Sequence, residues 1–417
     1  MNFYLFCGIL WKYTKTTPKR VFSMIKLISY IIPVMLNFVF GTILFIVVQR
    51  LSEAGVNEFI KGLPLTIWAG VYGALNVVIG KLVTVKNAHR FIMFAGMLVC
   101  LCALGIILVP AQNMLFVWMA LVGAAFACYC VPFQLFAKGL ESSSGNSSSL
   151  AAVSKTAGRY TASWSIGLAC GPLVSGFSVT GGLYTCMATG LLIALGISFA
   201  AAHMPAAESG AADDNSQAAN SDIPAQKSAI PDLALLGWIV GGICTFGISH
   251  IRTRLQPLGL ANGLSAQALA TMLFSVSAVQ SLTAFTLSLI SVRWQFRRLP
   301  ALLAGGIGLL TLLVFSRAEL ANYFYFAAAA YGIYTGVFYY YFVFYSLSHP
   351  TRASIYTGIN EAVVSCNSII SPIIGGFMAT ISLTCPFLIS GLLTAGATVL
   401  HVTVLHRAQK KYPEAVK

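Results

Sequence analysis

The segment Gly167-Leu-Ala-Cys-Gly171-Pro172-Leu-Val-Ser-Gly176 has a counterpart 200 residues later, Asn367-Ser-Ile-Ile-Ser371-Pro372-Ile-Ile-Gly375-Gly376. Both lie in apolar surroundings, and a proline inside an apolar helix removes a backbone hydrogen bond and bends the helix. Glycines in such a helix let a neighbouring helix approach closely. The shared pattern therefore predicts one bent helix that occurs twice with the same structural role.

Flanking residues extend this correspondence when residue n is aligned with residue n + 200. The identical pairs are Ser154 and Ser354, Gly158 and Gly358, Pro172 and Pro372, Gly176 and Gly376, and Phe177 and Phe377. Two similar halves in one apolar chain are typical of transporters whose halves are related by an axis along the membrane normal.

The composition indicates that lipid surrounds most of the chain. Of 417 residues, 58% are hydrophobic and only 9% are charged, and the mean hydropathy is +0.82. A soluble domain carries about 25% charged residues, so too little charge is present to cover soluble domains of this size. This argues against an ordinary soluble enzyme, a disordered protein, a disulfide scaffold and a nucleic-acid binder.

Twelve stretches have the length and apolarity of membrane-spanning helices, which need about 20 residues because the backbone must satisfy its own hydrogen bonds in lipid. They are 27–49, 63–83, 91–109, 113–137, 155–179, 181–203, 233–253, 264–292, 299–316, 320–348, 354–380 and 383–405. We therefore expect an all-α integral membrane protein with 12 transmembrane helices, arranged as two pseudo-symmetric six-helix bundles.

A polar stretch rich in Ala, Ser, Asp and Asn separates the first six helices from the last six, and it has no apolar face to bury. The expected organisation is a cytoplasmic N-terminal segment (1–26), an N-terminal bundle (27–203), a flexible cytoplasmic linker (204–232), a C-terminal bundle (233–405) and a cytoplasmic tail (406–417). Of the 25 Lys and Arg residues, 20 fall on one side and 5 on the other if both termini are cytoplasmic. Topology thus accounts for the net charge of +14 without a nucleic-acid partner.

On these features the chain resembles the major facilitator superfamily over nearly its whole length. The segment 167–176 is similar to that family's GxxxGPxxxG antiporter motif, and a basic loop after the second helix contains Gly80, Lys86 and Arg90. Thr84 occupies the place of the family's loop Asp. The resemblance implies a secondary transporter of a small solute that works by alternating access, with antiport and export favoured by the helix motif. It also implies helix-bend and gating roles for Gly167, Gly171, Pro172, Gly176, Pro372, Gly375 and Gly376.

Glu361 is the only acidic residue well inside a predicted span. An ionisable group within the membrane is expensive and marks a functional site by default, so we expect Glu361 to carry a proton or bind substrate. Asn360 and Asn367 lie beside it on the same polar stripe. The alternative is a structural ion pair of Glu361 with a loop cation such as Arg293 or Arg297.

Other polar side chains at membrane depth are further candidates. Arg159 and Tyr160 lie in the matching region of the helix at 155–179, where Arg159 attracts an anionic substrate, pairs with Glu361 or reaches the interface. Gln134 and Gln280 are substrate contacts or helix-to-helix hydrogen bonds. The group His250, Arg252 and Arg254 at the end of the seventh span recruits an anion or anchors the helix at the interface.

We expect no cofactor and no metal, because no nucleotide-binding loop and no metal-ligand spacing is present. The expected partners are a small-molecule solute, protons and the lipid bilayer, and the expected state is a monomer in a bacterial inner membrane. A non-transporting sensor or assembly scaffold on the same fold is the main alternative, and an integral membrane enzyme is the other.

Overall fold

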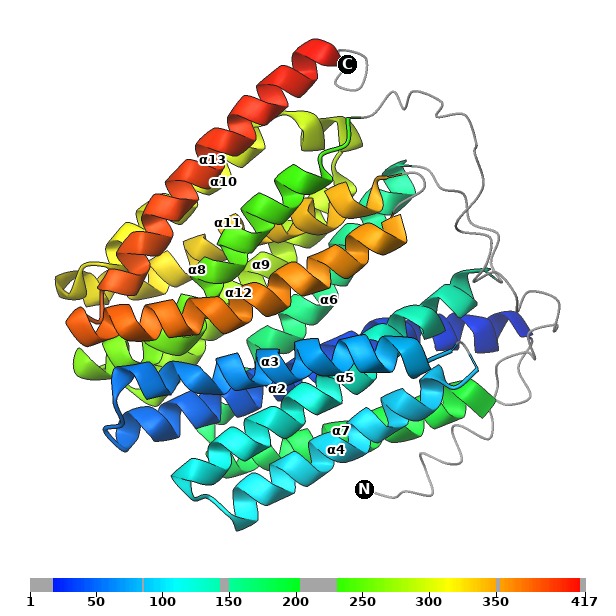
Figure 1. Ribbon diagram of the computed structural model, residues 1–417, viewed down its shortest axis with the longest axis horizontal. Coiled ribbons are helices and arrows are strands. Elements are labelled where there is room, and N and C mark those ends of the chain that lie inside the picture. The colour runs from blue at the N-terminus through cyan, green and yellow to red at the C-terminus, as the bar shows by residue number, and fades with distance from the viewer. Residues whose placement is uncertain (1–17, 85, 143–149, 203–230, 350–352, 413–417) are drawn as a thin grey trace.

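The computed structural model describes residues 18–84, 86–142, 150–202, 231–349 and 353–412. Within them every regular element is a helix (Figure 1). The first six long helices are α2 (Pro18–Glu53), α3 (Glu58–Leu82), α4 (Ala88–Leu108), α5 (Gln112–Ser142), α6 (Leu150–Phe177) and α7 (Val179–Ala202). The second six are α8 (Ala234–Ala261), α9 (Ala266–Leu289), α10 (Arg298–Phe315), α11 (Phe324–Leu347), α12 (Ala353–Ile381) and α13 (Cys385–Lys411), with 3₁₀ turns η1 (Val292–Phe296) and η2 (Ala318–Tyr323).

The twelve long helices match the twelve predicted spans, and their ends differ most in three places. The first helix begins at Pro18, inside the segment 1–26 that was expected to precede it, and the last continues to Lys411, inside the expected tail. The seventh was expected to end near residue 253 but runs through Pro257 to Ala261. The linker at 204–232 lies outside the described residues except for its last two positions.

Ten described helices are long and apolar enough to cross a membrane. The other two long helices are α6, which is rich in Ser, Thr and Gly, and α11, which is rich in Tyr. Both pack inside the molecule. α6 lies against α2 of its own bundle and against α9 and α11 of the other, and most side chains of α11 are buried. Protein surrounds these helices, so they need less apolar surface than helices that face lipid.

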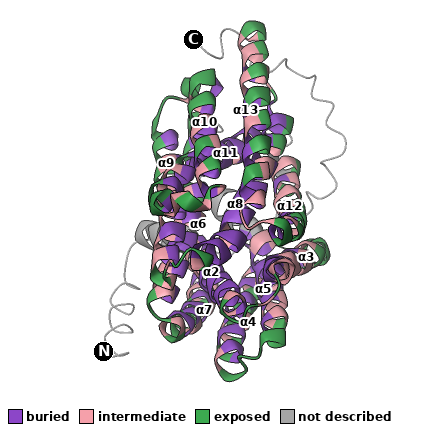
Figure 2. Cartoon of the chain, turned by 90° about the vertical axis from the view of Figure 1, so that its left-hand side faces the viewer, coloured by how far each residue is buried: buried purple, intermediate pink, exposed green. Residues whose placement is uncertain are grey.

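Each set of six helices forms its own apolar core, and together they make the two bundles in Figure 1. The bundles meet along α6 against α9 and α11, α3 against α12, and α2 against α8. In Figure 2 the buried residues gather where the bundles meet, and exposed residues cover the outside. Along α3 and α12 the bundles are closest near the junction of α2 with α3 and spread toward the other end (Figure 1).

Two equivalent turns support the internal repeat. Gly55, between α2 and α3, has φ +66°, and Gly263, between α8 and α9, has φ +75°. Glycine adopts this left-handed conformation without the steric cost that other residues meet. Each is followed two residues later by a helix N-cap, Asn57 or Ser265, whose side chain accepts a backbone hydrogen bond. The first helical hairpin of each bundle is therefore closed in the same way.

The α2–α6 contact provides a test of glycine packing. A Cβ on Gly171 would lie 2.5 Å from Phe38 O and from Thr42 N, whereas a Cβ on Gly196 meets nothing within 4 Å. We expect Gly171→Ala to lower the free energy of unfolding by about 1–3 kcal/mol, because backbone atoms must move. The matched control Gly196→Ala should leave stability unchanged or raise it slightly. Thermal unfolding of both purified variants in detergent measures this, and equal melting temperatures would show that the close approach is unimportant.

Candidate functional site

A hydrogen bond between Tyr72 and Glu361 crosses from one bundle to the other. Tyr72 Oη on α3 donates to Glu361 Oε2 on α12 at 2.9 Å. Six residues earlier on α3, Thr66 Oγ1 donates to the carbonyl of Ile369 on α12 at 3.2 Å. Glu361 therefore lies at the interface between the two bundles.

Groups from three other helices surround this carboxylate. Tyr72 stacks on Trp68, with ring centroids 5.3 Å apart. Tyr129 and Cys130 of α5 and Tyr160 of α6 lie within electrostatic range of Glu361. In the described part of the chain no cation pairs with it. The surroundings are thus hydroxyl and thiol groups, which suit a carboxyl group that gains and loses a proton more than one held in a fixed ion pair.

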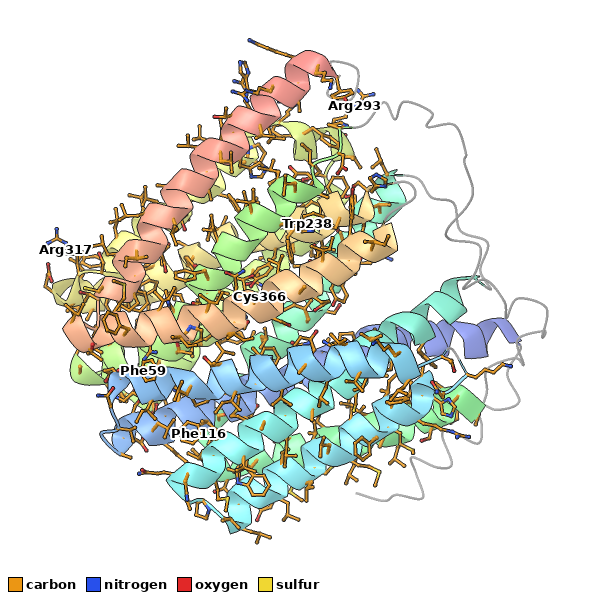
Figure 3. All side chains as sticks on the ribbon, in the orientation of Figure 1. Phe59, Phe116, Trp238, Arg293, Arg317 and Cys366 are labelled. Carbon is orange, nitrogen blue, oxygen red and sulfur yellow. The ribbon has the colours of Figure 1, made fainter. Side chains whose placement is uncertain are left out.

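The structure does not form the ion pairs considered for Glu361. Arg159 is exposed and makes no salt bridge with it, and Arg297 stacks on the Trp294 ring at 4.7 Å. Figure 3 shows Arg293 near one end of the molecule and Arg317 at the opposite end. The suggested pairing of Arg159 with Glu361 is therefore wrong for this conformation, because a long cation on α6 reaches solvent more cheaply than a buried partner.

The two asparagines of α12 have partners within the second bundle. Asn360 Oδ1 accepts from Trp238 Nε1 at 2.9 Å and from Ser346 Oγ at 2.8 Å. Asn367 donates to the carbonyl of Val363, one turn earlier in its own helix. Asn360 thus joins α12 to α8 and α11, while Asn367 is half-buried beside Gly242. Their predicted role at a solute or proton site stays a prediction.

Gln280 lies between the bundles on α9, fully buried. Its Nε2 donates to Ser165 Oγ on α6 at 2.7 Å, and the next residue, Ser281, donates to the carbonyl of Ala162 at 2.9 Å. These bonds hold α6 against α9, the helix-to-helix alternative given for Gln280. The side chain of Gln134 lies outside the described residues.

The predicted helix-bend residues lie at helix crossings. A Cβ on Gly167 would lie 2.2 Å from Val34 O, and one on Gly176 would lie 2.2 Å from Ala270 Cβ across the bundle interface. On α12, a Cβ on Gly375 would meet His250 Nε2 at 2.4 Å, and one on Gly376 would meet Phe59 Cα of the other bundle at 3.0 Å. Pro172 and Pro372 lie inside α6 and α12. The motif thus packs one face of each helix within its bundle and another against the opposite bundle.

In the basic loop between α3 and α4, Asn87 makes the hydrogen bonds that order the loop, and the acidic residue of the family pattern is absent. Asn87 Oδ1 accepts from the Thr84 backbone at 2.6 Å, and its Nδ2 donates to the carbonyl of Leu82 at 3.1 Å. Gly80, Lys86 and Arg90 are exposed, and neither cation forms a salt bridge with any residue that the structure describes. Asn87 therefore orders a loop that lacks the acidic residue, and the gating role of this motif stays a prediction.

A second charged group between the bundles was not predicted. Arg254 of α8 is fully buried; its Nη1 donates to the carbonyl of Glu58 on α3 and lies 3.9 Å from Glu58 Oε2, and its Nη2 donates to the carbonyl of Pro372 at 3.0 Å. Lys61, also buried, donates to Glu58 Oε1. We call Glu58, Lys61 and Arg254 the latch. It closes the interface at the end where α2 joins α3.

The expected interfacial role of His250 and Arg254 is wrong. His250 is fully buried, with Nδ1 2.8 Å from Ser390 Oγ and Nε2 2.9 Å from the carbonyl of Ser371. Because α8 continues to Ala261, these side chains lie inside the helix and not at its end. Glu58 was missed because the second span was expected to begin at residue 63, whereas α3 begins at Glu58. An acidic residue in the first turn of a span could have marked the latch, because an unpaired charge there is costly.

The structure also bears on metal and cysteine chemistry. Among the described residues no group of three or more His, Cys, Asp or Glu side chains is placed to hold a metal ion, and the nine described cysteines are all free.

No protein-family model matches the sequence, and none of the curated proteins does. Solved structures do match. A crystal structure of a mutant of the nucleoside transporter NupG superposes with a TM-score of 0.57 over 92% of this chain and 99% of the NupG chain, at 11% sequence identity. The chain has the fold of the major facilitator superfamily. The predicted fold class is confirmed, and within this major facilitator fold the latch closes one mouth of the bundle interface.

The charges of the latch predict how it opens. Arg254 makes the cross-bundle contacts of the latch, because Lys61 and Glu58 both lie on α3. Arg254→Gln removes both contacts, whereas Glu58→Gln keeps the bond from Arg254 to the backbone carbonyl of residue 58. A hydrogen bond to a charged group contributes about 1.5–3 kcal/mol, so Arg254→Gln should open this end about tenfold more often, and Glu58→Gln less so. The measurement is the rate at which a membrane-impermeant maleimide, added on the side of the α2–α3 junction, labels Ser277→Cys in a cavity shared by both bundles.

The labelling is done in a chain from which the native cysteines have been replaced. Glu319→Gln is the matched control, because Glu319 pairs with Arg317 in an exposed salt bridge. Labelling of the Arg254→Gln variant at the rate of this control would show that the latch does not close the interface.

Proposed function

We propose that the protein is a secondary transporter that moves a small solute across the membrane by alternating access. The observation that carries this proposal is an interface between two bundles that the latch closes at one end, and along which α3 and α12 spread apart toward the other end. Breaking one cross-bundle ion cluster then reverses which side reaches the interior. The polar groups along the interface, and the lipid-facing outer surfaces, support the same function.

We propose proton coupling through Glu361. An ionised carboxylate accepts a stronger hydrogen bond than a neutral one, so the Tyr72–Glu361 bond holds α3 against α12 most firmly when Glu361 is ionised. A proton arriving on Glu361 weakens this bond between the bundles. Proton binding and bundle movement are linked because both act on the same hydrogen bond.

Export fits the proline-glycine pattern of α6, and we propose this direction. The distribution of Lys and Arg supports cytoplasmic termini, and short loops support a bacterial inner membrane. Because the two bundles complete the interface within one chain, we propose that a monomer is sufficient.

Flux in proteoliposomes tests the transport function. With a broad panel of solutes and an imposed pH gradient, we expect gradient-driven flux of at least one solute. Glu361→Gln should lower the gradient-dependent part to near the background of protein-free liposomes, because an amide cannot take up and release a proton as a carboxyl group does. The matched control is Glu319→Gln, which removes an exposed carboxylate at the protein surface.

Flux that stays gradient-driven in the Glu361→Gln variant would contradict proton coupling through this residue. Absence of flux for every solute under every gradient would contradict transport itself and favour a sensor or scaffold on this fold. Turnover of a solute without net movement would favour a membrane enzyme.

Accessibility as a function of pH tests the coupling without a known solute. The reporter is again maleimide labelling of Ser277→Cys. Below the pH at which Glu361 protonates, the cross-bundle bond weakens, and labelling should rise relative to the same reporter carrying Glu361→Gln. The chemistry of the thiol affects both samples equally, so their ratio isolates Glu361. A ratio that does not change with pH would show that Glu361 does not control opening.

A further inference from the structure

A cavity lies between the bundles on the side of the latch. About 20 Å³ of it is open to the centre of a water-sized sphere, which is room for about one water molecule. Four helices line it: Gly41, Leu44 and Phe45 of α2, Leu168 and Pro172 of α6, Ile248 and Arg252 of α8, and Leu273, Val276 and Ser277 of α9. Its walls are apolar except for one guanidinium group and one hydroxyl group.

The guanidinium group of Arg252 has no counter-ion. In the described part of the chain it forms no salt bridge, and its Nη2 is buried without a hydrogen-bond partner. Two residues further along α8, Arg254 is held by Glu58 and by Pro372. An uncompensated cation within the membrane carries a large desolvation cost. The protein's own groups therefore compensate the buried charge of Arg254 but not that of Arg252.

The neighbours of Arg252 are neutral. The hydroxyl groups of Tyr331 and Tyr339 on α11 lie within its electrostatic range, and the Tyr331 hydroxyl is buried without a partner. Trp164 of α6 packs edge-on against Tyr339, with ring centroids 5.1 Å apart. The carboxylates on the bundle interface are used elsewhere, since Glu58 binds the latch cations and Glu361 binds Tyr72. The protein thus provides donors here and no anion.

We propose that Arg252 binds the carboxylate of the transported solute, and that this solute is an organic anion with an apolar body. The proposal rests on the transport function proposed above. A guanidinium group matches a carboxylate with two parallel hydrogen bonds, and the apolar walls accept the rest of the molecule. A small hydrated inorganic anion would lose most of its bound water here, and the apolar walls offer no hydrogen bonds to replace it, so the lining selects against such an anion.

Both bundles build this site, which connects binding to movement. The cation comes from α8 of the second bundle, while α2 and α6 of the first supply much of the apolar wall. When the bundles rotate, the guanidinium group separates from that wall and the cavity opens. In the closed arrangement the cavity has room for about one water molecule, so an organic anion reaches Arg252 only when the bundles move apart at the latch end.

The test uses purified full-length protein and defined probes. Benzoate, phenylacetate and octanoate are each compared with the corresponding primary amide, together with acetate and inorganic phosphate. Binding is followed by calorimetry and by the thermal stabilisation that a ligand produces by mass action. We expect at least one of the three larger carboxylates to bind at least about tenfold more tightly than its amide and than acetate, because the amide lacks the charge and acetate lacks the apolar body.

Variants assign the binding to Arg252. Arg252→Gln should weaken carboxylate binding about tenfold or more, Arg252→Lys should restore part of it, and Arg317→Gln should leave it unchanged. Elution as a single species and an unliganded melting temperature close to that of the native chain establish that each variant is folded. If Arg252→Gln alone fails this check, Arg252→Lys and the carboxylate-to-amide comparison decide.

Equal binding of acids and amides, unaltered binding by Arg252→Gln, or no binding of any carboxylate would overturn the proposal. These outcomes are separable from failure of the transport function. Carboxylate binding through Arg252 without flux would support the anion site and contradict the transport function. Flux of a neutral solute that is insensitive to Arg252→Gln would support the transport function and contradict the anion site.

Discussion

Hydrocarbon does not solvate charge, and this constraint determines where ionisable groups lie in the protein. Glu58, Lys61, Arg254 and Glu361 all lie where α3 meets the second bundle, and Arg252 lines a cavity between the bundles. The interface between the bundles is therefore the polar part of an otherwise apolar molecule. It is also the part that can separate, because ion pairs and hydrogen bonds there exchange for water once it opens.

Packing inside each bundle has the opposite character. Gly167 and Gly171 bring the backbone of α6 into direct contact with that of α2, where neither helix can slide without a clash. Gly375 brings α12 equally close to His250 of α8. Close packing transmits strain and resists deformation. If the proposed alternating access holds, each bundle moves as a unit and the movement is confined to the interface that carries the charges.

Much of this architecture follows from the sequence. Apolar length located the twelve helices, and the repeated proline-glycine pattern identified α6 and α12 as equivalent, because both signals are local. The latch was missed because Glu58 and Arg254 are 196 residues apart and α8 continues past its expected end. Local pattern allowed a helix-to-helix bond for Gln280 but did not identify its partner or that of Asn360, since Ser165, Trp238 and Ser346 lie on other helices. Glu361 was found from sequence because a lone carboxylate within a span needs no partner to be noticed.

Helix α3 carries both charged contacts with the second bundle, the latch at Glu58 and the bond from Tyr72 to Glu361. Glu58 begins α3, and Tyr72 follows about 21 Å further along it at 1.5 Å per residue. A single helix therefore carries the latch at its first turn and, near its middle, the tyrosine that binds the proposed proton site Glu361. A compound bound anywhere along the contact of α3 with α12 would hinder both the opening of the latch and the breaking of the Tyr72–Glu361 hydrogen bond. That contact is therefore the place where a single inhibitor would block the proposed movement most directly.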